Sequence, residues 1–291
     1  MIKQLSAFVL LYFWLALFSV SSYAEVGLWQ ISKGDTTSYL FGTVHVGDKQ
    51  MQGLPDKVKR AIEKSDKVMV EVNLESLSPL QIQQRSMPFM LLQGNETLQS
   101  TLSPAVYKKV VDYFAAKQID VALFERYAPW AVMVTILQLE YQRLGFSEAN
   151  GIDKQVVNYA QQHNIPIGEF ESLEYQLKMF SQLGQYSDAM LQETFTQMAD
   201  LDTYFLDMIS AWRQGDLKQL EHYYNTSFAE GEYGALAERL MIKERNNNWL
   251  EALQQQLPHE SLFVAVGALH LVERYGLITQ LQQQGYTVSK I

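Results

Sequence analysis

The stretch SYLFGTVHVGD (residues 38–48) combines an apolar run with a histidine that stands three residues after a glycine. A second stretch, SLFVAVGALHLVE (261–273), repeats this arrangement around Gly267 and His270. Two of the chain's five histidines therefore lie in matching Gly-x-x-His settings. Each apolar run predicts a buried strand, and each histidine then follows directly after its strand.

Further strands and helices are predicted outward from these two stretches. Residues 27–43 alternate around a Lys-Gly-Asp turn, which predicts a β-hairpin, and strands are also expected at 67–73, 165–170 and 286–291. Helical patterns occupy 55–65, 78–93, 103–117, 128–144, 151–163, 172–183, 187–213, 216–227, 232–256 and 271–284. This order predicts an α/β fold with a mostly parallel central sheet, built from strands of both chain ends and covered by helices, plus a large helical excursion or cap.

The first 24 residues have the pattern of a secretory signal peptide. Lys3 gives a positive n-region, residues 7–20 are apolar, and Ser-Tyr-Ala at 22–24 supplies small residues for cleavage. The apolar run of 14 residues is short for a membrane span, which needs about 20, although a retained N-terminal anchor stays open. We therefore expect cleavage after Ala24 and a periplasmic or secreted product that begins at Glu25.

The rest of the chain is expected to form a single domain over 25–291, with helical excursions at about 78–145 and 172–256. No cysteine is present, so no disulfide can form. Loss of the leader, whose one charged side chain is Lys3, changes the formal net charge from −9 to −10. A negative chain disfavours nucleic acid and anionic lipid as partners. We expect no stable membrane insertion after cleavage, and the sequence leaves the oligomeric state open.

Four predicted strands deliver polar side chains to one edge of the sheet. These side chains are His45, Glu71, Asn73, Glu169, Glu171 and His270. In open α/β sheets, ligands bind at the carboxyl ends of the strands. Gly42 and Gly267 would let the backbone approach a ligand closely there. The sequence thus predicts a binding site at this edge.

Two histidines and a carboxylate suit Zn, Mn, Co or Fe when one coordination position stays open. Such a metal lowers the pKa of bound water and polarises a carbonyl, which is hydrolase chemistry. Spacing alone leaves a second interpretation open, in which both histidines are strand-end residues bonded to the backbone. The sequence lacks H-E-x-x-H, Gly-x-Ser-x-Gly and a phosphate loop, so zincin, serine-hydrolase and NTPase functions have no support.

The order of the motifs resembles the TraB/GumN family, which includes the Tiki proteins. The matching segments are FGTVH (41–45), VEVN (70–73), GID (151–153), ERN (244–246), FVAVGALHL (263–271), GL (276–277) and GYTV (285–288). The resemblance runs from about Leu28 to Ile291. Tiki members are described as metalloproteases that depend on Mn or Co, so it implies a metal-binding, metalloprotease-like protein.

The resemblance also implies roles for individual residues. His45 and His270, with Gly42 and Gly267, match the two Gly-x-x-His motifs and would bind the metal. Glu71 would be the third ligand or the general base, a choice that the sequence leaves open.

Further family positions lie outside this set. Arg245 would stabilise a developing oxyanion and Asn246 would orient water or substrate, unless Arg245 pairs with Glu244 or Glu251 on a solvated helix face. Three more positions match the family without an assigned role, namely Asp153, Glu171 and Gln176. Glu273 departs from the pattern, because the resemblance leads us to expect glycine there.

The leading hypothesis is an exported metal-dependent hydrolase of the peptidase or amidase type. It would use a divalent ion (Mn, Co or Zn) and act on a peptide or another small-molecule substrate. The alternative is a non-catalytic periplasmic ligand-binding or accessory protein that uses the same pocket.

Overall fold

The computed structural model describes residues 26–228 and 231–291. Within them, six strands form one sheet in the order β4-β3-β5-β2-β1-β6. The strands are β1 Leu28–Lys33, β2 Thr36–Thr43, β3 Lys67–Val70, β4 Ile167–Glu169, β5 Leu262–Gly267 and β6 Thr287–Lys290. The expected signal peptide and its cleavage site lie outside the described residues.

Strand direction divides the sheet into two parts. The strands β2, β5, β3 and β4 are parallel neighbours, whereas β1 pairs antiparallel with β2 and with β6. Gly34 turns the β1–β2 hairpin with a φ of 65°, which a glycine adopts without strain. The expected α/β fold, with a mostly parallel sheet that draws strands from both chain ends, is confirmed.

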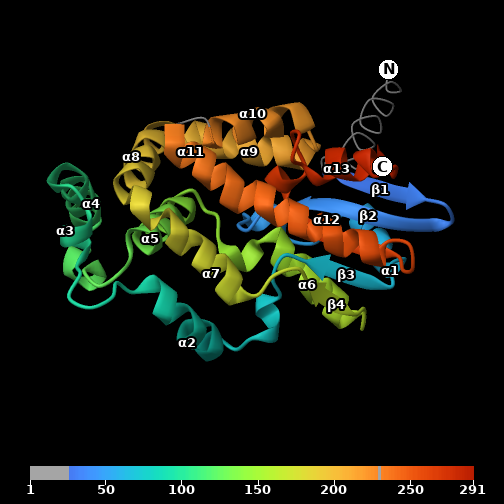
Figure 1. The fold of residues 1–291 in the computed structure, drawn as a ribbon, viewed down its shortest axis with the longest axis horizontal. Helices are drawn as coiled ribbons and strands as arrows, with labels where there is room; N and C mark the ends of the chain where they lie inside the picture. Colours follow the sequence, from blue (N-terminus) through green and yellow to red (C-terminus); the bar gives the residue numbers. More distant parts are fainter. Residues whose placement is uncertain (1–25, 229–230) are drawn as a thin grey trace, which may run out of the picture.

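Helices make up most of the remaining described chain (Figure 1). They are α1 Asp56–Glu63, α2 Pro79–Met90, α3 Leu98–Thr101, α4 Pro104–Ala116, α5 Pro129–Arg143, α6 Ile152–Gln162, α7 Leu173–Gln182, α8 Ser187–Gln197, α9 Leu201–Gln214, α10 Leu217–Ser227, α11 Gly231–Glu238, α12 Glu244–Gln256 and α13 Leu277–Gln283. The side chains of Ser103 and Asp216 cap α4 and α10, because each accepts a hydrogen bond from backbone N–H groups of its helix.

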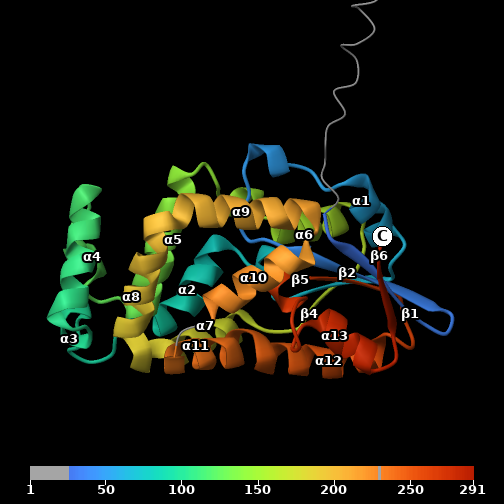
Figure 2. The ribbon, with the colours of Figure 1, turned by 90° about the horizontal axis from the view of Figure 1, so that it is seen from above.

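Helices cover both faces of the sheet, and β5 shows why. Its side chains are buried on both sides: Phe263 joins a core with α1, α6 and α9, while Val264 joins a second core with α12 and α13. Figure 2 shows α6 and α9 on one side of the strands and α12 and α13 on the other. A strand covered on both faces reads as a continuous apolar run, as this one does.

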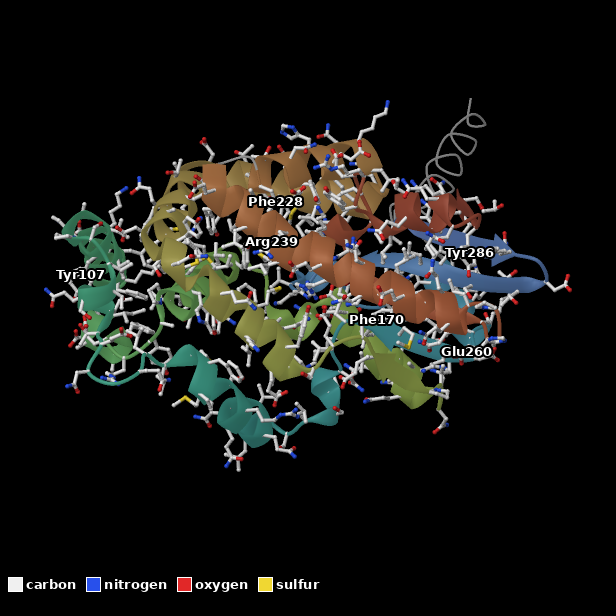
Figure 3. All side chains as sticks on the ribbon, in the orientation of Figure 1. Tyr107, Phe170, Phe228, Arg239, Glu260 and Tyr286 are labelled. Atoms are coloured by element: carbon white, nitrogen blue, oxygen red, sulfur yellow. The ribbon has the colours of Figure 1, made fainter. Side chains whose placement is uncertain are left out.

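One long helical rod reaches the face of the sheet that α12 and α13 cover, and its α12 part packs on that face. It consists of α11, a π-helical turn (Arg239–Lys243) and α12, which follow one another without a break. Arg239, at the start of the π-helical turn, lies in the half of the rod nearer α11 in Figure 3. Phe170, labelled in Figure 3, follows β4. Its ring stacks on Trp249 of α12, with ring centroids 5.4 Å apart.

A helical lobe extends away from the sheet. It contains α3, α4, α5 and α8 around a core of its own that includes Leu98, Phe114, Ile136 and Met190. Figures 1 and 2 place α3 and α4 at the end of the molecule opposite the sheet, and Tyr107 of α4 marks this end in Figure 3. The single domain over 25–291 stays a prediction.

The last helix differs from expectation at its start. The apolar pattern predicted a helix over 271–284, but α13 begins at Leu277. Glu273 interrupts the pattern with a φ of 66°, in the left-handed region that a helix cannot continue through.

No helix in the described part of the chain is both long and apolar enough to cross a membrane.

Candidate functional site

Parallel strand pairing brings the two Gly-x-x-His motifs together. β5 lies between β2 and β3, with Thr43 opposite Gly267 and Val70 opposite Ala265. The carboxyl ends of these three strands therefore meet at one edge of the sheet. His45, Glu71 and His270 follow those ends directly.

The missing side chain of Gly267 marks the point that these residues share. A Cβ atom on Gly267 would lie 3.3 Å from Glu71 Oε1, 3.5 Å from His270 Cδ2 and 4.0 Å from His45 Nε2. All three side chains thus border the same small space. Gly42 has a packing role instead, because a Cβ there would lie 3.0 Å from Leu271 Cδ1 and 3.1 Å from Ala268 Cα.

His270 is buried and bonded at both ring nitrogens. Its Nδ1 lies 2.6 Å from Asn246 Oδ1, and its Nε2 lies 3.0 Å from Arg245 Nη1 and 3.9 Å from Glu71 Oε1. The ring also packs on Trp249, with centroids 4.4 Å apart. Burial, together with the Arg245 cation, lowers the pKa of His270 to about 3, so the ring is neutral at neutral pH.

Glu71 is a buried carboxylate that stays ionised. Its Oε1 accepts a hydrogen bond of 2.7 Å from the backbone N–H of Gly267, and its Oε2 accepts one from Arg245 Nη2. Burial alone would raise the pKa of Glu71. The Arg245 cation, His270, His45 and the Gly267 bond outweigh that effect and hold the pKa well below its ordinary value.

Arg245 of α12 is buried at the centre of the site. Its Nε donates to Glu171 Oε1 at 2.9 Å, its Nη1 donates to the Met241 carbonyl at 3.2 Å, and its guanidinium lies over the Trp249 ring. It therefore does not lie on a solvated helix face. Glu244 pairs with Arg239 instead.

Glu171 is the second carboxylate bound to Arg245, and the sequence assigned it no role. It is buried after β4 and accepts hydrogen bonds from Arg245, from Trp249 Nε1 at 2.9 Å and from Gln176 Nε2 at 3.2 Å. Its backbone N–H donates to the Glu71 carbonyl, so the two carboxylates lie on adjacent strand ends.

Trp249 is a contact residue that sequence reasoning missed. The available signal was helical spacing, because Arg245, Trp249 and Leu253 share the buried face of α12 at intervals of four residues. An arginine on an apolar face indicates a buried partner, but the pattern does not identify that partner.

Asn246 was expected to orient water or substrate, and the structure gives its side chain other contacts. The residue is fully buried. Its Oδ1 faces His270 Nδ1, while its Nδ2 donates to the carbonyls of His270 and Tyr275 at 3.0 and 2.7 Å. Both polar groups of the amide are thus bonded to the protein.

His45 lies on the open side of the site. Its side chain is 68% exposed, and its Nδ1 lies 3.3 Å from Oδ2 of Asp153 in the first turn of α6. Desolvation by the surrounding protein lowers the pKa of His45, but Asp153 and then Glu71 outweigh it and raise the pKa to about 9. The backbone also meets here, because a Cβ on Gly151 would clash with the His45 carbonyl at 2.5 Å.

Two of the expected edge residues bond to each other instead of to a histidine. The backbone N–H of Asn73 donates to Glu169 Oε2 at 2.9 Å. Three buried polar atoms on these strand ends or beside them have no hydrogen-bond partner within residues 26–228 and 231–291, namely Thr43 Oγ1, Asn73 Oδ1 and Asp153 Oδ1. Buried polar atoms are normally satisfied, so these three atoms are available to hydrogen-bond a polar ligand or water.

The donor types at this edge fit a divalent ion, but they do not form a closed ligand set. Over residues 26–228 and 231–291, no group of three or more His, Cys, Asp or Glu side chains is arranged to hold a metal. The reason is visible in the contacts, because the Arg245 guanidinium touches both His270 Nε2 and Glu71. Metal binding by these three residues would need Arg245 to release His270.

Comparisons with known proteins agree with the motif order. The profile of the TraB/PrgY/gumN family matches residues 27–290. The uncharacterized protein YbaP of Escherichia coli (strain K12) is 26% identical over 82% of this chain and 85% of its own length. The equivalent protein of Shigella flexneri matches with the same values.

Two relatives carry the name of an activity. Metalloprotease TIKI2 of Danio rerio is 27% identical over 86% of this chain and 58% of its own length. Metalloprotease TIKI1 of the same organism is 23% identical over 90% of this chain and 62% of its own length. No solved structure matches this chain.

Proposed function

This chain belongs to the TraB/PrgY/gumN family, and from that premise we propose that it is a metal-dependent hydrolase that cleaves peptide or amide bonds. The single observation that supports this most is the convergence beside Gly267, where His45, Glu71 and His270 border one point within 4.0 Å. The name of the Tiki relatives as metalloproteases supports the same reaction class.

We propose that Nε2 of His45, Nε2 of His270 and the Glu71 carboxylate hold a divalent ion such as Mn, Co or Zn. When bound, such an ion supplies a polarised carbonyl and a water of lowered pKa. Both imidazoles would bind in the neutral form, so His45, whose pKa lies at about 9, would lose its proton on metal binding, while Nδ1 of each ring is held by a side-chain oxygen.

The protein's own groups would do the rest of the chemistry. The Gly267 N–H holds the Glu71 carboxylate in place, either as a ligand or as the base that takes a proton from the attacking water. Arg245 keeps its charge at any working pH and presents several donors, so it suits the negative oxygen that develops on the substrate. Its bonds to Glu171 would retain it beside the site after it releases His270.

We also propose that the protein is exported, with residues 1–24 as a cleaved leader. Amino-terminal sequencing of protein from a periplasmic or culture fraction tests this. A product that begins at Glu25 supports export, whereas an intact Met1 in a membrane fraction indicates a retained anchor.

The central test is metal content together with turnover. Wild-type protein, His45→Ala and His270→Ala are purified after loading with Mn, Co or Zn, and His259→Ala provides a matched control in an exposed turn. We expect stoichiometric metal in wild type and His259→Ala and little in the other two, with peptide hydrolysis following metal content. Stoichiometric metal in both site variants contradicts the site. If the protein binds metal and peptide but does not hydrolyse the peptide, the alternative of a non-catalytic binding protein is supported.

A further inference from the structure

We propose that Asn246 is a positioning residue that fixes the orientation and the tautomer of His270, so that the Nε2 lone pair faces the site. The tautomer follows from contacts of the protein alone. The consequence for metal binding rests on the proposed function. This assigns Asn246 a role that acts through His270 and not through substrate.

The orientation of the Asn246 amide is determined by its neighbours. Its nitrogen lies 3.0 Å from the His270 carbonyl oxygen and 2.7 Å from the Tyr275 carbonyl oxygen. Carbonyl oxygens only accept hydrogen bonds, so the group that faces both of them must be the NH₂ donor. The amide oxygen then faces the imidazole, and a flipped amide would lose both donor contacts.

The amide oxygen determines where the proton of His270 lies. Asn246 Oδ1 accepts only, and it is 2.6 Å from His270 Nδ1, so Nδ1 must carry the hydrogen. In a neutral imidazole, Nε2 is then bare. Arg245 supplies independent support at the other nitrogen, because its guanidinium only donates and lies 3.0 Å from Nε2.

One helix presents both of these neighbours. Arg245 and Asn246 are consecutive residues at the start of α12, directly after the π-helical turn Arg239–Lys243. Such turns occur often at functional sites, where they change the direction of the side chains that follow. The Met241 carbonyl within this turn accepts from Arg245 Nη1, which ties the turn to the site.

The loop that follows His270 holds Asn246 from the side opposite α12. The segment after His270 turns back so that the Tyr275 carbonyl reaches Asn246, and Gln280 Nε2 also donates to that carbonyl at 2.8 Å. Packing on Trp249 limits rotation of the ring. Groups of this kind around a ligating histidine are typically worth about 10–100-fold in metal affinity.

Nitrogen NMR of the metal-free protein tests the tautomer directly. With ¹⁵N-labelled histidine and His270→Gln for assignment, we expect His270 to show a protonated Nδ1 and a bare Nε2 near neutral pH. A wild-type ring protonated at Nε2 overturns the proposal, and this result needs no Asn246 variant to fold. In folded Asn246→Ala only Arg245 still favours a bare Nε2, so we expect a second, Nε2-protonated form to appear beside the wild-type form, whereas Asn247→Ala should keep the wild-type pattern. Asn247 is the matched control, because it is the next residue of α12, is exposed and contacts Gln280.

Metal titration separates this proposal from the proposed function. If His270 binds the metal and Asn246 positions His270, Asn246→Ala weakens Mn or Co binding by about 10–100-fold, while Asn247→Ala leaves it unchanged. If wild-type protein binds no metal, the proposed function fails and the NMR result still decides the tautomer. If Asn246→Ala keeps both the wild-type tautomer and the wild-type affinity, Asn246 has no positioning role.

Discussion

The two Gly-x-x-His motifs have nearly the same local sequence and opposite surroundings. The His45 side chain is 68% exposed and its Nδ1 lies 3.3 Å from Asp153, whereas the His270 side chain is 6% exposed and is bonded at both nitrogens. Both histidines nevertheless follow neighbouring parallel strands and border the same point beside Gly267. The motif therefore determines where each histidine lies, and distant segments determine its environment.

This difference divides the site into a closed half and an open half. The closed half consists of His270, Arg245, Asn246, Glu71 and Glu171, whose contacts also belong to the folded core. The open half consists of His45 and Asp153, which solvent reaches. We therefore expect changes in the closed half to alter stability as well as function, and changes in the open half to alter function alone.

Arg245→Met should give the largest effect. It leaves the buried carboxylates of Glu71 and Glu171 without their cation, which typically costs about 3–5 kcal/mol. Denaturant unfolding followed by circular dichroism measures the loss. Arg239→Met is the matched control, because its pair with Glu244 is exposed and worth about 0–1 kcal/mol. A loss below about 1 kcal/mol for Arg245→Met would show that the closed half does not stabilise the fold.

The two histidines provide the most direct comparison. His270→Ala leaves Asn246 Oδ1 unsatisfied and removes a ring packed on Trp249, so we expect a loss of about 1–3 kcal/mol in unfolding free energy. His45→Ala should cost no more than about 1 kcal/mol, because the side chain and its ion pair with Asp153 are exposed. Thermal and denaturant unfolding of the two variants measure both values, and equal losses would break the distinction between the halves.

The helical lobe sharpens the comparison with a buried carboxylate outside the site. Burial raises the pKa of Glu140, but Lys117, Arg143 and Tyr113 outweigh it and lower the pKa to about 2. Because the folded pKa lies below the unfolded one, this stabilisation is complete above pH about 4.5 and is lost as the pH falls towards 2. Allowing for solvent screening of the partly exposed Arg143, we expect about 1–2 kcal/mol.

Unfolding free energies at several pH values between 7 and 3 test this contribution. Wild type should lose stability more steeply below pH 4.5 than Glu140→Gln does, since the variant lacks the titrating carboxylate. Parallel curves would mean that Glu140 contributes nothing to acid sensitivity. The acid sensitivity of the fold would then come from other carboxylates, such as Glu71 and Glu171 beside Arg245.

Local pattern explains what the sequence could predict. The apolar runs predicted the buried strands, and the helical patterns predicted α4 and α10, whose first turns Ser103 and Asp216 cap, because each signal lies within a few residues of its effect. The expected parallel sheet placed His45, Glu71 and His270 at one edge, because each follows the end of its strand.

Contacts between distant segments explain what the sequence could not predict. The bonds of Asn246 and Arg245 to His270 and Glu171 join residues 24 to 74 positions apart. No local pattern records such a contact. The contrast between an exposed His45 and a buried His270 has the same origin, because α12 covers one motif and not the other.

Glu273→Gly should give the smallest effect, and it tests the loop that closes the His270 half. Glu273 stands where the family resemblance leads us to expect glycine, and its φ of 66° is a backbone conformation that disfavours other residues by roughly 1–2 kcal/mol. Glycine relieves this strain, but it loses the contact of Glu273 with Asn225 Nδ2 and costs about 0.5–1 kcal/mol in chain entropy. These effects oppose one another, so we expect a net change within about 0.5 kcal/mol in denaturant unfolding. Glu273→Val is the control, because a β-branched residue is strained further at this φ and should destabilise the protein by about 1 kcal/mol or more. If valine is tolerated as well as glycine, the loop does not keep a positive φ at residue 273 in solution. The loop would then not hold the Tyr275 carbonyl in the position where it accepts a hydrogen bond from Asn246.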